Sequence, residues 1–261
     1  MDKLYIIKIG GNIIDDEQGL DHFLAEFAAL PGHKILVHGG GKLATRVAEA
    51  MNIPQQMIEG RRVTDAETLK VVTMVYAGFI NKNIVAALQQ KGINAIGLTG
   101  ADANAIRAHK RVHPQTDYGF VGDVDEINSG FLNTLLQAKL SIVMAPITHD
   151  ASGLLLNTNA DTIAQELAKG LANLYEVDLV YCFEKRGVLS IASDEGSVIP
   201  DINLSLFLEL KQQGVISEGM IPKLQNAFTA LSSGVHRVRI GHAAQLPEII
   251  AGHAGTTIQH D

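Results

Sequence analysis

Short apolar stretches rich in β-branched residues alternate along the chain with longer stretches in which apolar residues recur at helical spacing. The short stretches lack polar alternation, as expected of parallel strands covered on both faces. Helices between them would cover both faces of one sheet. The pattern therefore predicts an α/β fold with an open, mainly parallel sheet. The predicted strands span residues 4–9, 34–38, 94–98, 141–145, 178–183 and 237–241.

The longer stretches carry apolar stripes and end signals typical of amphipathic helices. Asp65 can cap the start of the longest one, and Gly92 lies near its end. Residues 104–127 break the alternation and predict short strands and turns, and residues 147–157 predict a hairpin with Gly153 in its turn. The predicted helices span residues 19–30, 65–90 and 161–175.

Size and composition indicate one continuous domain. The chain has 261 residues, of which 46% are hydrophobic, and this is enough to build a large buried core. A soft boundary near residue 175 predicts an N-terminal lobe of residues 1–175 and a C-terminal lobe of residues 176–261. The single cysteine, Cys182, excludes a disulfide within the chain and fits a reducing compartment.

Charge and hydropathy argue against several classes of partner. The formal net charge is −7, so the surface is expected to repel nucleic acids and anionic lipids. No apolar run in the sequence approaches the ~18 residues of a membrane span. The first residues do not resemble a signal peptide. We therefore expect a cytoplasmic protein that binds neither nucleic acid nor membrane.

Two glycine-rich turns follow predicted strands, KIGGN at residues 8–12 and HGGGK at residues 38–42. Bare backbone at such turns lets N–H groups reach a phosphate or a carboxylate. The second turn fits a dinucleotide fingerprint that ends at Ala44, although residues 52–62 make a poor second strand for that motif. It does not fit a P-loop, which needs an earlier glycine and a following Ser or Thr. A loop for the other reactant and a tight turn without a ligand both remain open.

Three charged residues stand where charge is costly or unusual. Lys8 lies inside an apolar strand, where a lysine is expensive unless it meets an anion or the strand lies at an edge. Asp161 closes the stretch NTNAD, in which either Asn159 or Asp161 can cap the following helix. Pro222 can start a helix that puts Lys223 in its first turn. A cation there opposes the helix dipole, which favours an anion in front of the turn.

These motifs in this order resemble the amino acid kinase family. The match spans nearly the whole chain, and the pieces together are specific where each alone is not. The resemblance implies a three-layer α/β/α sandwich in which the N-terminal lobe binds an amino acid and the C-terminal lobe binds ATP. The matching pieces are KIGG at 8–11, HGGGK at 38–42, GRRVT at 60–64, GLTGAD at 97–102, GFVGDV at 119–124, NTNAD at 157–161 and GMIPK at 219–223.

The activity that the resemblance implies is ATP-dependent phosphorylation of the side-chain carboxylate of an N-acylated L-glutamate. Acetyl is the default acyl group, and the reaction would belong to arginine biosynthesis. The resemblance implies Mg²⁺ bound mainly through the nucleotide phosphates, and we assign no metal ligand in the chain. It also implies a homodimer.

Carried over residue by residue, the resemblance assigns roles to individual residues of these motifs. It makes Lys8 and Lys223 the residues that stabilise the transition state, and Asp161 the acid that orients both. Gly10 and Gly11 would offer backbone N–H groups to the transferring phosphoryl group. Arg62 would clamp the α-carboxylate of the acyl-glutamate, which would be held by Gly40, Gly41, Arg62, Asn157 and Asn159. ATP would be bound by Glu184, Gly187, Val188, Gly219 and Met220.

Two departures leave the nucleotide site and the acyl group open. Relatives usually carry an Asp-Val pair where this chain has Glu184, Lys185 and Arg186, which either alter the nucleotide contacts or form a solvated rim. A charged acyl group such as succinyl would need an extra cation in the pocket. Five cations are candidates, or else form an exposed basic hairpin: Arg61, Arg107, His109, Lys110 and Arg111. A kinase for another acidic amino acid and a binding regulator without turnover are the remaining alternatives.

Overall fold

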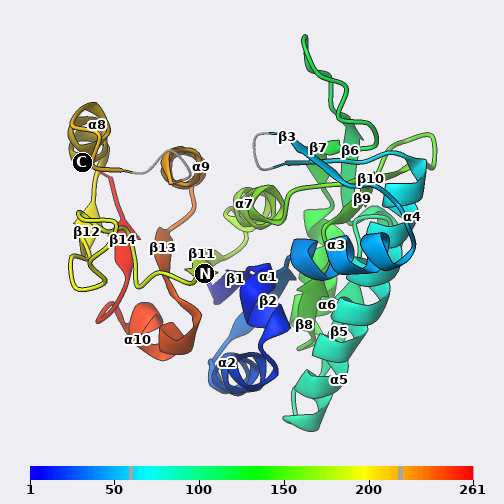
Figure 1. Ribbon diagram of the computed structural model, residues 1–261. Coiled ribbons are helices and arrows are strands. Elements are labelled where there is room, and N and C mark those ends of the chain that lie inside the picture. The colour runs from blue at the N-terminus through cyan, green and yellow to red at the C-terminus, as the bar shows by residue number, and fades with distance from the viewer. Residues whose placement is uncertain (59–60, 217–219, 261) are drawn as a thin grey trace.

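A sheet of eight strands forms the middle layer of the molecule (Figure 1). The computed structural model describes residues 1–58, 61–216 and 220–260. Within this sheet all neighbouring strands pair in parallel except β13 and β14, so the predicted mainly parallel α/β sheet is confirmed. In order across the sheet the strands are β12 (Asp201–Ile202), β14 (Thr256–Ile258), β13 (Arg237–His242), β11 (Glu176–Phe183), β1 (Lys3–Ile9), β2 (His33–His38), β8 (Ser141–Met144) and β5 (Ala95–Leu98).

Helices cover both faces of the sheet, because successive side chains of a strand point to opposite sides. In β1, Leu4 and Ile6 belong to one apolar core, and Tyr5, Ile7 and Ile9 belong to the other. Figure 1 shows α7 and α9 on one side of the strands and α2 and α10 on the other, which gives the expected three layers. The helices are α1 (Gly11–Asp15), α2 (Glu17–Ala29), α3 (Gly41–Ala50), α4 (Ala66–Thr73), α5 (Asn81–Gln90), α6 (Ser129–Gln137), α7 (Ala160–Leu171), α8 (Leu204–Gln212), α9 (Ile221–Ser232) and α10 (Leu246–Ala251), with short 3₁₀ turns at Asp102–Asn104 and Ala243–Gln245.

The longest helical stretch joins α4 and α5 through a π-helical segment, Met74–Ile80. As predicted, Asp65 caps its start, since its carboxylate accepts a hydrogen bond of 2.7 Å from the Thr68 N–H. Gly92, with φ +79°, follows its end.

One helix is apolar enough to span a membrane, contrary to the prediction from the sequence that no run is. By length and composition the continuous helix Ala66–Gln90 passes that test, with a mean hydropathy of 1.5 in its most apolar window. The helix packs here against the second core, and 44% of that window is buried, as in the core helix of a globular fold. Met74 and Phe79 are its exposed large apolar side chains.

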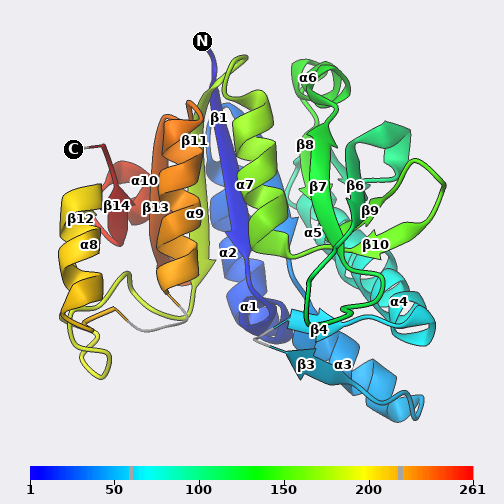
Figure 2. The ribbon, with the colours of Figure 1, turned by 90° about the horizontal axis from the view of Figure 1, so that it is seen from above.

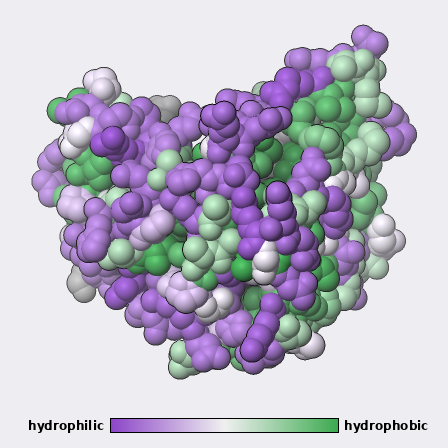
Figure 3. All heavy atoms as spheres, turned by 90° about the horizontal axis from the view of Figure 1, so that it is seen from below, coloured by the Kyte–Doolittle hydropathy of each residue, from purple (hydrophilic) through white to green (hydrophobic). Residues whose placement is uncertain are grey.

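Figure 3 shows that the face seen from below is mostly hydrophilic, with apolar groups in patches.

A smaller, four-stranded sheet stands beside the main one and packs on α7 (Figure 2). It confirms the short strands predicted in 104–127 and the hairpin predicted in 147–157, where Gly153 turns with φ +88°. Residues 52–62, judged a poor strand, contribute instead to a separate two-stranded hairpin outside the main sheet. The strands of these two sheets are β10 (Leu155–Asn157), β9 (Ile147–His149), β6 (Ile106–Lys110), β7 (Gly122–Ile127), β3 (Gln56–Ile58) and β4 (Arg61–Val63).

The main sheet crosses the predicted lobe boundary near residue 175 without a break. Strand β11, which begins just after that boundary, pairs with β1 from Lys3 to Ile9. Strand β1 also pairs with β2 on its other side, so it is a central strand and its Lys8 is not at an edge. The division into an N-terminal and a C-terminal lobe stays a prediction.

Candidate functional site

The two glycine turns lie side by side at the carboxyl edge of the sheet. Strands β1 and β2 are parallel neighbours with Ile9 opposite His38, so both strands end at the same level. The Gly39 N–H donates a hydrogen bond of 3.0 Å to the Ile9 carbonyl and ties the turns together. Helices α1 and α3 begin directly after the turns, and neither N-cap glycine provides a side chain for the first N–H groups. Those N–H groups remain available to an anion.

Gly40 is required by its surroundings. Its φ of +149° is one that residues with a side chain rarely adopt, and a Cβ there would lie 2.3 Å from the Ile80 side chain. Ile80 ends the π-helical segment, and the Tyr76 ring from the same segment would be 3.1 Å away. The π-helical segment therefore packs directly against the bare backbone of the second turn.

The residue directly before this turn is a buried histidine, His38, which ends β2. Its Nδ1 lies 2.8 Å from the Gly39 carbonyl, and its Nε2 lies 3.3 Å from the side-chain amide of Asn81. The carbonyl can only accept, so Nδ1 carries the proton and Nε2 accepts from Asn81. Burial lowers the pKa of His38 to about 4, so the ring is neutral at pH 7.

Lys8 and Asp161 form an ion pair beside the first turn. Lys8 is 8% exposed, and its Nζ lies 2.7 Å from Asp161 Oδ1. Asp161 occupies the first turn of α7, whose N-cap is Asn159: the Asn159 side chain accepts from the N–H groups of Asp161 and Thr162 at 2.8 and 3.2 Å. Of the two caps that the sequence allowed, the structure selects Asn159. The Asp161 carboxylate is thereby free to face the lysine.

Lys223 approaches the same place from the first turn of α9, one residue after Pro222, as the sequence predicted. Burial lowers the pKa of the Lys223 ammonium; the nearby Asp161 opposes this shift and Lys8 adds to it. The structure thus brings the three predicted catalytic residues into one neighbourhood. With Gly10 and Gly11, the two lysines line a cavity of about 460 Å³.

A second cavity, of about 190 Å³, adjoins the first at Gly41, which lines both. All five residues predicted to hold the acyl-glutamate lie around it. The Asn157 side chain also donates a hydrogen bond of 3.0 Å to the Thr64 hydroxyl, which fixes its orientation. The predicted residues in its lining are Gly40, Gly41, Arg62, Asn157 and Asn159, joined by Arg61, Tyr76 and Arg111.

Arg62 is buried and already engaged by protein groups. Its Nη2 donates to the Gly41 carbonyl and to the Thr45 hydroxyl, both at 2.8 Å, and its Nη1 donates to the Gln55 side chain. A guanidinium has five N–H donors, so these three bonds do not use all of them, and the Tyr76 hydroxyl is a further neighbour. The arginine therefore braces the start of α3 as well as lining the second cavity.

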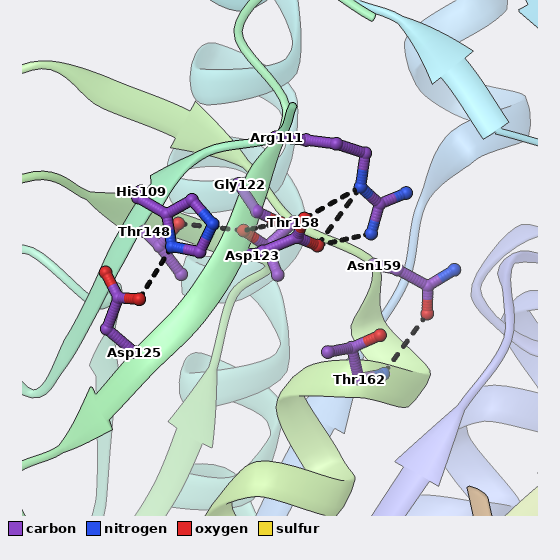
Figure 4. Close-up of polar contacts among 9 residues, drawn as sticks. All are labelled: His109, Arg111, Gly122, Asp123, Asp125, Thr148, Thr158, Asn159 and Thr162. Atoms are coloured by element: carbon purple, nitrogen blue, oxygen red, sulfur yellow. Dashed lines mark hydrogen bonds and ion pairs between the residues drawn. The ribbon is translucent and has the colours of Figure 1, made fainter. Parts of the chain in front are cut away.

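The five basic candidates for an acyl-group partner divide into two sets. Arg61 and Arg111 line the second cavity, and Asp123 holds the Arg111 guanidinium through Nε bonds of 3.1 and 3.0 Å. Figure 4 shows this pair beside Asn159. The other three have carboxylate partners on the exposed part of the small sheet and its loop: Arg107 with Glu126, His109 with Asp125, and Lys110 with Asp117.

Buried hydroxyls fix the loop that carries Asn159 to the strand that carries Asp123. The Thr148 and Thr158 hydroxyls lie 2.8 Å apart, and Thr158 donates a 3.3 Å hydrogen bond to the Gly122 carbonyl (Figure 4). A Cβ at Gly122 would meet both hydroxyls at less than 3 Å, so glycine is needed for this close approach.

The predicted nucleotide residues lie around the lysine cavity and a smaller one. Glu184 and Met220 line the lysine cavity. Gly187, Val188 and Met220 line a further cavity of about 80 Å³. Gly219 lies outside the described residues. Lys185 pairs with Glu195, which partly neutralises the added charge of this loop.

Two aromatic residues of these cavities were missed by sequence reasoning, Tyr76 and Phe183. Tyr76 sits in a helix whose apolar pattern hides the π turn. Phe183 ends an apolar strand directly before Glu184, which the resemblance assigns to ATP, but the Phe183 side chain itself was not singled out.

Comparison with known proteins gives near full-length matches. Residues 3–242 match the amino acid kinase family. The acetylglutamate kinase of Phocaeicola vulgatus is 58% identical over 247 residues, which cover 95% of this chain and 96% of that protein. The acetylglutamate kinase of Bacteroides thetaiotaomicron is 53% identical over 258 residues, 99% of each chain.

Among solved structures, the N-acetylglutamate synthase of Neisseria gonorrhoeae, complexed with coenzyme A and N-acetyl-glutamate, matches with a TM-score of 0.84. The match covers 100% of this chain and 60% of that one, at 22% sequence identity. At that identity the likeness speaks for the fold alone.

Proposed function

The chain belongs to the amino acid kinase family, and we propose that it transfers the γ-phosphoryl group of ATP to the side-chain carboxylate of N-acetyl-L-glutamate, in arginine biosynthesis. One observation carries the proposal. The cavity with the two lysines and the cavity with the five predicted substrate residues meet at Gly41. Near full-length identity to acetylglutamate kinases supports the choice of substrate.

The nucleophile in this reaction needs no general base. A glutamate side chain has a pKa of about 4.3, so it is ionised at pH 7. The obstacle is repulsion between this anion and the polyphosphate, and it is overcome by positioning and by cations. In the proposal, Arg62 and Asn157 hold the acyl-glutamate so that its side chain points past Gly41 toward the lysine cavity.

Lys8 and Lys223 then meet the negative charge that spreads over the transferring phosphoryl oxygens. They come from opposite sides, from strand β1 and from helix α9. Asp161, at 2.7 Å from Lys8, pairs with its ammonium and keeps it aimed at the cavity. The N–H groups at Gly10 and Gly11 add uncharged donors to the same oxygens.

The residues present fit a magnesium ion that arrives with the nucleotide. Among the described residues, Glu184 is the acid in the lining of the lysine cavity, and Asp161 is occupied by Lys8. Mg²⁺ is often held by one or two carboxylates together with substrate phosphates. When bound, the ion would supply charge neutralisation on those phosphates.

Another group of metal-ligand residue types in the described chain lies far from this cavity, around the opposite end of β11. It consists of Glu176, Asp178 and His236. Its Asp178 already forms ion pairs with Lys3 and Arg239.

Trapping with hydroxylamine tests the proposal. The protein is incubated with Mg-ATP and either N-acetylglutamate, N-succinylglutamate, glutamate or aspartate, and acyl phosphate is captured as a hydroxamate. We expect hydroxamate from N-acetylglutamate and far less from the two free amino acids. No hydroxamate from any of them would leave a binding regulator without turnover as the better account.

A second candidate substrate, N-succinylglutamate, is favoured by one specific observation. Arg61 and Arg111 line the substrate cavity and offer cations to a charged acyl group. If succinyl is the acyl group, Arg111→Gln will lower the rate with N-succinylglutamate and spare the rate with N-acetylglutamate. Arg107→Gln is the matched control, because Arg107 pairs with Glu126 away from the cavity. Equal effects on both substrates would remove this candidate.

The homodimer and the cytoplasmic location implied by the family resemblance stay predictions. The exposed apolar side chains Met74 and Phe79 on the long helix fit a protein that associates with a second copy.

A further inference from the structure

Phe183, the last residue of β11, stands beside the two lysines that the proposed function assigns to the phosphoryl group. The Lys223 Nζ lies 3.5 Å from the centroid of the Phe183 ring, and the Lys8 Nζ lies 5.3 Å from it. Both values fall within the ~6 Å over which an aromatic face attracts a cation. We propose that Phe183 is a positioning residue that holds the Lys223 ammonium beside Lys8, ready for the phosphoryl group. This inference rests on the proposed function.

The need for such a partner follows from charge. Lys8 has a carboxylate at 2.7 Å, whereas within the described part of the chain Lys223 forms no ion pair. Burial disfavours the charged form of Lys223 and the neighbouring Lys8 adds repulsion, while Asp161, which is already paired with Lys8, offsets only part of this. The negative face of an aromatic ring offsets part of both effects without adding a charge that would repel ATP.

The ring is itself held in place. Tyr181 lies two residues earlier on β11, so its side chain points to the same face of the sheet. The two rings are parallel within 2°, with centroids 6.1 Å apart. The Tyr181 hydroxyl donates a 3.4 Å hydrogen bond to the Asp161 carbonyl. One continuous set of contacts therefore leads from the start of α7 through two rings to Lys223.

Replacing Phe183 with mono-, di- and trifluorinated phenylalanine tests the inference, because each fluorine weakens the negative face and leaves the shape nearly unchanged. We expect the logarithm of kcat to fall steadily along the series, by about tenfold in total, which is the rate equivalent of ~1.4 kcal/mol. The KM values for ATP and acyl-glutamate should change far less. The same series at Phe207 is the control, since that buried ring packs with Phe228 and, among described residues, has no cation over it.

Two outcomes would overturn the inference. Unchanged kcat along the series would mean that the ring only fills space, and a change confined to the KM for ATP would mean that it stacks on the nucleotide.

If the unsubstituted protein forms no hydroxamate, the proposed function fails, and NMR titration of the Lys223 ammonium then tests the inference separately. The pKa of that ammonium should fall with fluorination, while the charged neighbours Lys8, Lys42, Asp161, Glu184 and Lys185 stay the same. A constant pKa would contradict the positioning role.

Discussion

Lys8 combines three constraints that rarely meet in a lysine: it is buried, it lies on a central strand, and it has a carboxylate at 2.7 Å. Burying a charge costs free energy unless the charge is paired or meets an opposite charge on a ligand. Asp161 contacts the Lys8 ammonium from one side only. The burial of Lys8 is therefore explained if an anionic ligand contacts the ammonium from the cavity side. Single residues of this kind carry most of the mechanism, and they can be tested one at a time.

Removal of either lysine should strongly slow turnover. We expect Lys8→Ala and Lys223→Ala each to lower kcat by on the order of 10²–10³, the usual effect of losing one donor to transition-state charge. Lys42→Ala, which changes another lysine in the lining of the same cavity, should lower it by less than about tenfold. Circular dichroism must show all three variants folded. Near-normal turnover in Lys8→Ala or Lys223→Ala would remove that residue from the mechanism.

Arg62→Lys should mainly raise the KM for the acyl-amino acid. A lysine cannot present the planar fork that binds both oxygens of a carboxylate. We expect a rise of roughly 10- to 100-fold, the equivalent of one charge-assisted hydrogen bond. Initial rates over a range of acyl-glutamate concentrations measure it. An unchanged KM would assign Arg62 to bracing α3 through Gly41 and Thr45 alone.

His38 should make the fold sensitive to mild acid. Its folded pKa of about 4 lies below the ordinary 6.5, so the unfolded chain binds the proton first. The contribution to stability is therefore complete above pH 6.5 and is lost as the pH falls toward 4. From pH 7 to 5 this one group should remove about 2 kcal/mol from the free energy of unfolding. His38→Asn, which keeps a donor for the Gly39 carbonyl and does not titrate, should lack that loss in denaturant titrations at the two pH values. Equal losses in both proteins would show that His38 is not the group responsible.

Among the elements, six strands of the main sheet and its long helices were predictable from the sequence because burial on both faces, or on one stripe, repeats along them, whereas the short strands β12 and β14 were not predicted. The six predicted strands and the Asp65 cap follow from such patterns. The β3–β4 hairpin was not predictable, since three-residue strands give no period to detect. The π-helical segment was not either, because one extra residue per turn leaves its apolar composition unchanged.

The same distinction holds for the site. Lys8 and Lys223 were recognisable because each is a cation where a cation is costly, and Asp161 because it closes the polar cluster NTNAD before a helix. The role of the Phe183 side chain was not, because an apolar residue at the end of an apolar strand resembles core even when the loop that follows it is assigned to the nucleotide. Within the basic hairpin, Arg111 lies at the cavity and Arg107 lies away from it. This difference depends on the register of the strands, which the sequence does not reveal.

The end of α2 offers a test at the level of one element. The buried Lys34 Nζ donates to the carbonyls of Phe27, Ala28 and Leu30 at 3.2, 2.9 and 2.6 Å. Carbonyls at a helix C-terminus lack the usual helical partners, and of these three the Phe27 carbonyl also accepts from the Leu30 N–H. Lys34→Met fills the space and removes the donors, so it should lower the free energy of unfolding by about 1–3 kcal/mol. Lys70→Met, at an exposed ion pair, should change it little. Denaturant unfolding measures both, and an equally small change in Lys34→Met would refute its capping role.

At the scale of the whole molecule, the parallel sheet explains how distant residues meet. Strands β1, β2 and β11 are neighbours with their carboxyl ends at one edge, and α7 and α9 cover the face from which Asp161 and Lys223 reach that edge. Such an edge is the usual ligand site of open α/β sheets. The proposed reaction uses it with the amino acid on one side of Gly41 and the phosphates on the other.

Isotope transfer tests most directly whether the phosphoryl group goes to the carboxylate. N-acetylglutamate labelled with ¹⁸O in its side-chain carboxylate is incubated with the protein, Mg-ATP and hydroxylamine, and the released phosphate is analysed by mass spectrometry. Attack of the carboxylate on the γ-phosphorus makes an acyl phosphate whose bridging oxygen is labelled. Hydroxylamine then attacks the acyl carbon, and that oxygen leaves with the phosphate. The account predicts one ¹⁸O in each phosphate released, matched by one hydroxamate; unlabelled phosphate would mean that water, and not the substrate carboxylate, accepts the phosphoryl group.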